Sequence, residues 1–191
     1  MKKLICLGDS LTFGLGVRHN QKWTALVQQE TGWNVVNQGI NGDTTGGILA
    51  RLQHVSAVEQ PYVLVMGGSN DIFYSGSDSS ARSNMGAILH QLRSLGLTPL
   101  IGIPLGVDPN AVPGQYAALT DFTAAANTLE EYCRWLKQLC AAFSVPFVDF
   151  RADFQNSDGS IKTGLLADGL HPNISGHRLM ADRLISVLEA L

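Results

Sequence analysis

Five short apolar runs alternate with longer segments of helical periodicity, and this alternation constrains the fold most. The third run, Tyr62–Met66, is apolar throughout, which is typical of a strand covered on both faces. Strands that alternate with helices predict an α/β fold, with a parallel sheet joined by right-handed crossovers. The predicted strands are Leu4–Leu7, Trp33–Val36, Tyr62–Met66, Thr98–Ile103 and Pro146–Phe150, and the predicted helices are Lys22–Glu30, Thr45–Val58, Ser79–Leu95, Thr120–Phe143 and Ser175–Ala190.

Length and composition predict a single domain over residues 1–191. With 45% hydrophobic residues the chain is not a disordered one, and a formal net charge of −3 gives no electrostatic basis for binding nucleic acid. No apolar segment approaches membrane-spanning length, and the apolar run before Gly8 is too short for a signal peptide. We therefore expect no membrane span and a cytoplasmic location. The three cysteines are expected to pack in the core: Cys6, Cys133 and Cys140.

A serine follows the first predicted strand, at the sheet edge where open α/β folds carry ligand chemistry. Ser10 needs an adjacent base to act as a nucleophile, and His171 is the strongest candidate. Asp168, three residues earlier, can accept a hydrogen bond from one ring nitrogen and leave the other to take the serine proton. Two alternatives stay open: the Asp–His pair could simply cap the last helix, and Asp149 could be the acid instead.

Hydrogen-bond donors for a developing oxyanion follow the next two strands. Asn70 offers a side-chain amide, Gly42 offers a backbone N–H without an obstructing side chain, and the Ser10 N–H is a third donor. Each of these segments, taken singly, is also ordinary turn and cap sequence. Three such segments after three successive strands, together with the Asp–His pair, favour a catalytic site.

Four segments resemble, in order, the four sequence blocks of the GDSL, or SGNH, hydrolases. They are Gly8-Asp9-Ser10-Leu11, Asn41-Gly42-Asp43-Thr44, Gly68-Ser69-Asn70-Asp71 and Asp168-Gly169-Leu170-His171-Pro172. The resemblance implies a three-layer α/β/α, flavodoxin-like fold with a central parallel sheet of about five strands. It also implies a catalytic triad of Ser10, Asp168 and His171, an oxyanion hole of Ser10, Gly42 and Asn70, and no cofactor or metal. The α/β-hydrolases share the order Ser, Asp, His, but this serine lacks their GxSxG elbow.

We expect a serine hydrolase that cleaves small to medium acyl esters, small-molecule substrates, through an acyl-enzyme on Ser10. The long irregular segment from Pro104 to Leu119 follows the fourth strand and is predicted to form a pocket wall rather than a surface insertion. Because this segment is short for a lid, the pocket should be shallow and favour short acyl chains. The predicted substrate contacts are Phe73, Tyr74, Val107, Asp108 and Tyr116.

Several other functions fit the same residues. A thioesterase, a lysophospholipase, a carbohydrate acetylesterase or an acyltransferase would use the same catalytic groups and differ only in what binds beside them. A non-catalytic flavodoxin-like module could hold an anion or a flavin phosphate at the same edge. The chain lacks a dinucleotide-binding GxGxxG with its acid and a Walker A motif. The oligomeric state is not predicted.

Overall fold

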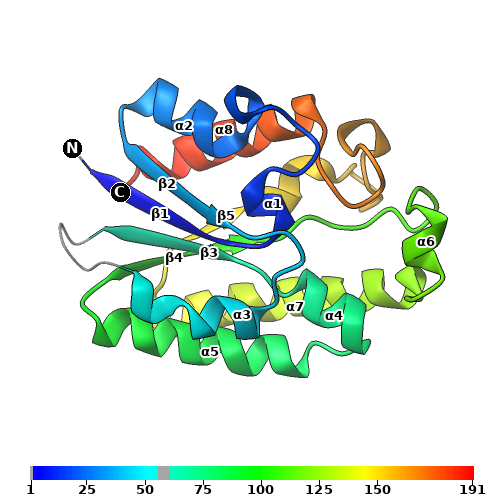
Figure 1. Cartoon of the computed structure of the whole chain (residues 1–191), viewed down its shortest axis with the longest axis horizontal. Helices are drawn as coiled ribbons and strands as arrows, with labels where there is room; N and C mark the ends of the chain where they lie inside the picture. The colour runs from blue at the N-terminus through cyan, green and yellow to red at the C-terminus, as the bar shows by residue number, and fades with distance from the viewer. Residues whose placement is uncertain (1, 56–60) are drawn as a thin grey trace.

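All five strands lie in one parallel sheet, in the order β2-β1-β3-β4-β5 (Figure 1). The computed structural model describes residues 2–55 and 61–191. The strand order is that of flavodoxin-like folds, so the predicted fold class is confirmed. The strands are β1 Lys3–Gly8, β2 Asn34–Gly39, β3 Tyr62–Met66, β4 Thr98–Ile103 and β5 Phe147–Asp149.

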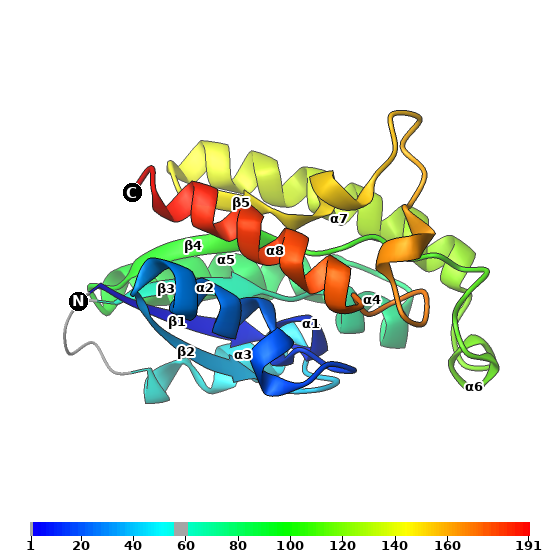
Figure 2. The same cartoon turned by 90° about the horizontal axis from the view of Figure 1, so that it is seen from above.

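Alternate residues of β1 face two separate cores, which makes the molecule three-layered. Leu4 and Cys6 pack with α2 and α8, whereas Ile5 and Leu7 pack on the opposite side of the sheet. Figures 1 and 2 show the same division, with α2 and α8 on one face and α3, α5 and α7 on the other. These helices are α2 Trp23–Thr31, α3 Thr45–Ala50, α5 Ser79–Ser94, α7 Phe122–Phe143 and α8 Ile174–Leu188.

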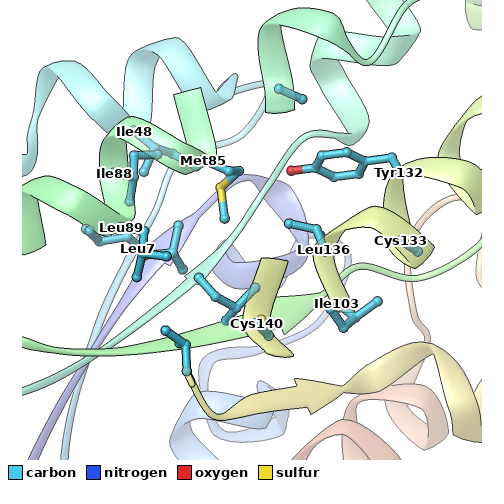
Figure 3. Packing of buried hydrophobic residues seen from close by; sticks show 14 of the residues in the cluster. Leu7, Ile48, Met85, Ile88, Leu89, Ile103, Tyr132, Cys133, Leu136 and Cys140 are labelled. Atoms are coloured by element: carbon cyan, nitrogen blue, oxygen red, sulfur yellow. The ribbon is translucent and has the colours of Figure 1, made fainter. Parts of the chain in front are cut away.

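Figure 3 shows the core between the sheet and α3, α5 and α7, a single cluster that includes Leu7, Met85 and Leu136. Cys133 and Cys140 belong to this cluster and Cys6 to the other, so the predicted packing role of the cysteines is confirmed. Burial raises the pKa of the Cys133 thiol to about 12, which leaves it protonated and unreactive at neutral pH.

Three short helices at the carboxyl ends of the strands were not predicted. They are α1 Ser10–Phe13, α4 Ser69–Ser75 and α6 Gly114–Ala117, each too short to show a periodic pattern. In Figure 1 they lie at the right, beyond the strand arrowheads. They therefore bring Ser10, the Asn70 segment and the Pro104 to Leu119 segment to one edge of the sheet.

Some predicted boundaries were wrong. The helix predicted from Thr45 to Val58 ends at Ala50, and a 3-10 turn occupies Leu52–His54; the end of that prediction lies outside the described residues. Glycines 46 and 47 in its first turn weaken it as a helix. Among the described residues, three more 3-10 turns lie at His19–Gln21, Phe150–Phe154 and Thr163–Leu165. No described helix has both the length and the apolarity needed to cross a bilayer.

Candidate active site

Ser10 is the first residue of α1, directly after β1. Asp9 precedes the helix and its Oδ1 accepts a hydrogen bond from the Leu11 N–H at 2.9 Å. This cap fixes the turn from strand to helix, so the Ser10 side chain lies at the sheet edge and lines a pocket there. Because Ser10 begins the helix, its own N–H has no partner within the helix.

His171 connects Ser10 to Asp168. Ser10 Oγ lies 2.9 Å from His171 Nε2, and His171 Nδ1 lies 2.8 Å from Asp168 Oδ2. The other carboxylate oxygen, Asp168 Oδ1, accepts from the backbone N–H groups of Leu170 at 3.1 Å and His171 at 2.8 Å. With Nδ1–H facing the carboxylate, Nε2 is free to accept the serine proton.

Hydrogen bonding keeps Asp168 ionised. Burial alone would raise the pKa of this carboxyl, but hydrogen bonds from the His171 side chain and from the His171 and Leu170 backbone, together with the His171 charge, hold it below its usual value. Asp168 is therefore a carboxylate at neutral pH, which orients the imidazole and stabilises its protonated form.

The structure separates the two alternatives for these residues. Asp149 lies at the end of β5 with its Oδ2 2.6 Å from Lys137 Nζ, and it is Asp168 that contacts His171. The last helix is capped by Asn173, whose Oδ1 accepts from the Gly176 N–H at 3.1 Å. Asp168 and His171 therefore do not serve as its cap.

Gly42 and Asn70 also line the pocket. Gly42 has a φ of 75°, a left-handed conformation that favours glycine, in a turn closed by the Asp43 N–H and the Ile40 carbonyl at 3.1 Å. Asn70 Nδ2 donates to the Asp43 carbonyl at 2.8 Å, and its second amide hydrogen leaves one donor for a ligand. Ser10, Gly42 and Asn70 thus line one pocket from three segments of the chain.

Two buried contacts hold these segments in place. Asp71 accepts from the Thr45 N–H at 2.9 Å and from the Thr45 hydroxyl at 2.6 Å, which ties α4 to the start of α3. From α7, the Tyr132 hydroxyl donates to the Gly67 carbonyl at 3.0 Å. The segment that carries Asn70 is therefore fixed to two helices.

Asp9 is 1% exposed, and its Oδ2 has no hydrogen-bond partner among the described residues. Burial raises the pKa of Asp9 to about 7, the Leu11 N–H opposes this, and the carboxylates of Asp43 and Asp71 raise it further. An acid that is largely neutral below pH 7 thus lies next to the serine.

The pocket has a volume of about 310 Å³ and a mostly apolar lining. Of the five predicted substrate contacts it includes four: Phe73, Tyr74, Val107 and Tyr116. The fifth, Asp108, is not among the lining residues that the structure describes. Its carboxylate instead accepts from the Asn110 N–H at 3.1 Å, and its own N–H donates to the Gly169 carbonyl at 2.9 Å.

Several lining residues were not predicted. Leu15 follows α1, Leu119 ends the Pro104 to Leu119 segment, and Phe122 begins α7. Leu119 was within reach of sequence reasoning, because it ends the segment already expected to form the wall. Within residues 2–55 and 61–191, no group of three or more His, Cys, Asp or Glu side chains could hold a metal ion.

The sequence as a whole matches one protein family. The profile of the GDSL-like Lipase/Acylhydrolase family matches residues 6–179, nearly the whole chain. The chain belongs to this family. Membership makes this GDSL hydrolase an enzyme of the carboxylic ester hydrolase class.

Individual relatives match nearly the full length of this chain. Esterase TesA of Pseudomonas aeruginosa is 27% identical over 98% of this chain and 88% of its own length. The Acetylxylan esterase of Geobacillus stearothermophilus is 28% identical over 94% of this chain and 90% of its own. Among solved structures, the aryl esterase of M. smegmatis superposes with a TM-score of 0.82 at 20% identity, covering all of both chains. At that identity the likeness establishes the GDSL fold only.

Proposed function

We propose that this GDSL hydrolase cleaves small to medium acyl esters through an acyl-enzyme on Ser10. The observation that carries the proposal is the chain of hydrogen bonds from Ser10 Oγ to His171 Nε2 at 2.9 Å and from His171 Nδ1 to Asp168 at 2.8 Å. These hydrogen bonds lie beside a pocket that is lined by Ser10 and His171 and also by Gly42 and Asn70.

In the first half-reaction, Ser10 Oγ attacks the ester carbonyl carbon while His171 Nε2 takes the serine proton. The carbonyl oxygen becomes an oxyanion that accepts hydrogen bonds from the N–H groups of Ser10 and Gly42 and from Asn70 Nδ2. Protonated His171, stabilised by Asp168, then gives its proton to the leaving alcohol. The products of this step are the free alcohol and an acyl ester on Ser10.

In the second half-reaction, water replaces the alcohol. His171 removes a proton from the water, whose oxygen attacks the acyl carbon, and the same three N–H groups bind the oxyanion again. Collapse returns the proton to Ser10 Oγ and releases the acid. The residues therefore complete the cycle with no group other than water.

The pocket supports a short acyl chain. Its volume of about 310 Å³ lies at the small end of the range for ligand pockets, and the inner lining of Val107 and Phe122 is apolar. Each buried methylene contributes about 0.8 kcal/mol until the space is filled. Rates should therefore be best from acetyl to roughly hexanoyl esters on that scale of burial. Two relatives, an esterase and an acetylxylan esterase, are consistent with ester substrates.

The deciding experiment measures kcat/KM for activated aryl esters of increasing acyl length, on the wild type, Ser10→Ala and Ser186→Ala. Ser186 lies on α8, away from the pocket, and is the matched control. Ser10→Ala should lose at least about 10³-fold in kcat, the scale seen when a triad nucleophile is removed. Residual turnover within tenfold of wild type would refute the role of Ser10, and a steady rise out to long-chain esters would refute the size limit.

Hydrolysis and acyl transfer would use the same residues and differ only in the acceptor that attacks the acyl-enzyme, water or an alcohol. Adding a sugar alcohol to the same assay and measuring acylated sugar against free acid separates the two. The cytoplasmic location expected from the sequence stays a prediction.

A further inference from the structure

Arg51, the first residue after α3, reaches back to three separate segments. Its Nε donates to Asp43 Oδ2 at 3.0 Å, its Nη1 to the Gln38 carbonyl at 2.8 Å, and its Nη2 to the Gly8 carbonyl at 3.0 Å. Gly8 is the last residue of β1, and Gln38 is the next-to-last residue of β2. One planar guanidinium thus joins the ends of two strands to the turn that carries Gly42.

Asp43 links Arg51 to Asn70. Its carboxylate pairs with Arg51, and its backbone carbonyl accepts the 2.8 Å hydrogen bond from Asn70 Nδ2. The Arg51 and Asp43 side chains are only 19% and 12% exposed, so solvent screens the pair weakly.

Gly47 makes room for the Asp43 carboxylate. A Cβ at position 47 would occupy the place of Asp43 Oδ1, whereas a Cβ at Gly46 would meet nothing closer than 3.6 Å. A side chain at position 47 would therefore force the Asp43 carboxylate out of the orientation in which it pairs with Arg51.

These contacts matter because the three proposed oxyanion donors come from three different segments. Ser10 follows β1, Gly42 follows β2, and Asn70 lies in α4. Donors stabilise an oxyanion only when their relative positions are already set, and misplacement by about 1 Å can cost about 10²-fold in rate. A guanidinium with a rigid fork of donors is suited to setting them.

We propose that Arg51 is a positioning residue of the oxyanion hole, acting through Asp43. The inference rests on the proposed function, since it assigns Arg51 to the same hydrolytic site. It predicts a loss that falls on kcat, because substrate binding in the apolar pocket does not use Arg51.

The first test compares Arg51→Met and Arg51→Lys with Arg183→Met. Arg183 on α8 also pairs with a carboxylate, Asp153, through its Nε at 2.8 Å, but lies outside the pocket lining. Arg51→Met should lower kcat by roughly 10- to 100-fold with KM within about twofold, Arg51→Lys should recover part of the loss, and Arg183→Met should leave both constants unchanged. An unchanged kcat in Arg51→Met, or a rise in KM alone, would overturn the inference.

The second test uses the neighbouring glycines of α3 and does not depend on how Arg51 variants fold. Alanine is the better helix former at both positions, so neither change should destabilise α3 by propensity. Gly47→Ala should nevertheless lower kcat, because Asp43 must swing away from Arg51, whereas Gly46→Ala should not. Equal kcat values in the two variants would count against the role of Asp43.

The third measurement needs no catalysis. Amide hydrogen exchange of segment 40–44 should be faster in Arg51→Met and Gly47→Ala than in wild type and Gly46→Ala. If wild type shows no Ser10-dependent turnover, the proposed function fails while the exchange result still decides whether Arg51 orders the turn. Unchanged exchange in Arg51→Met would reject the inference by itself.

Discussion

Asp9 is a buried acid directly before Ser10. One of its oxygens caps α1 through the Leu11 N–H, while the other is buried without a partner among the described residues. A pKa raised to about 7 lies far above the value near 3.9 of an aspartate in an unfolded chain. The folded protein therefore holds a proton here that the unfolded chain releases.

The sign of the resulting pH dependence follows from linkage. Between about pH 4 and pH 7 the folded state binds one more proton than the unfolded state, so the contribution of Asp9 to stability falls as pH rises through this window. Asp9→Asn keeps an oxygen for the Leu11 N–H and removes the charge. The variant should gain stability over wild type from pH 5 to pH 8, by about 3 kcal/mol at 1.4 kcal/mol per pKa unit, because about two units of the shift fall within this window.

Urea denaturation of both proteins at the two pH values measures this gain. Asp158→Asn is the control, since hydrogen bonds from Ser160 lower the pKa of that exposed carboxyl. Asp158→Asn should gain no stability relative to wild type as the pH rises from 5 to 8. A difference between Asp9→Asn and wild type that is independent of pH would mean that Asp9 is charged in the fold.

At the scale of elements, the segment after β4 packs against the loop of Asp168 and His171 as well as lining the pocket. Gly169, between Asp168 and His171, has a φ of 77° and packs against backbone atoms of residues 108–112. A Cβ there would lie 2.7 Å from the Asp108 carbonyl oxygen and 2.9 Å from Val112 N. These are backbone atoms, which cannot turn aside as a side chain can.

Gly169→Ala should therefore lower both stability and kcat, the latter by about tenfold or more, because the Asp168–His171 loop must shift. Gly159→Ala is the matched control. Gly159 has a φ of 85° but open space around its missing Cβ, so it carries the same backbone strain without the clash. It should cost about 1 kcal/mol in stability with no change in kcat. Melting curves and steady-state kinetics on both variants check this, and equal kcat values would show that the packing at Gly169 does not matter.

The same elements show what sequence could and could not predict. The strands were predictable because each contains a short apolar run, although β2 extends beyond its run through Asn37 and Gln38. The Ser10 and Asn70 positions were predictable because polar residues follow the ends of β1 and β3, and the His171 position because an acid stands three residues before it. The helices α1 and α4 were not, since four and seven residues are too few to show a helical period. Asp108 is not among the lining residues that the structure describes, and its loop sequence does not reveal that its backbone N–H contacts Gly169 and its carboxylate the Asn110 N–H.

At the scale of the whole molecule, α2 and α8 pack together on one face of the sheet, with His177 buried between them. Its Nδ1 accepts a hydrogen bond from the Trp23 backbone N–H at 3.4 Å, and its Nε2 has no hydrogen-bond partner among the described residues. Burial first, and then the charges of Lys22 and His171, lower the pKa of His177 to about 4.

An imidazole that stays neutral in the fold makes the molecule acid-sensitive. The unfolded chain takes up a proton at about pH 6.5, so the contribution of His177 is complete above that pH and is lost as pH falls toward 4, by about 3 kcal/mol. His177→Asn retains an oxygen near the Nδ1 position and should lose less stability than wild type between pH 7 and pH 4.5. Thermal melts at the two pH values measure the difference, and parallel losses in the two proteins would exclude His177 as the cause.

The hydrogen bond between Ser10 and His171 spans 161 positions of sequence. Contacts of such separation form only after a large loop has closed, whereas helices and neighbouring strands need far shorter loops. During refolding, the recovery of turnover should therefore follow the docking of the segment that carries His171. The helical signal in circular dichroism should follow the formation of local structure. Turnover therefore reports when residues 168–171 have reached Ser10, a contact that circular dichroism does not detect.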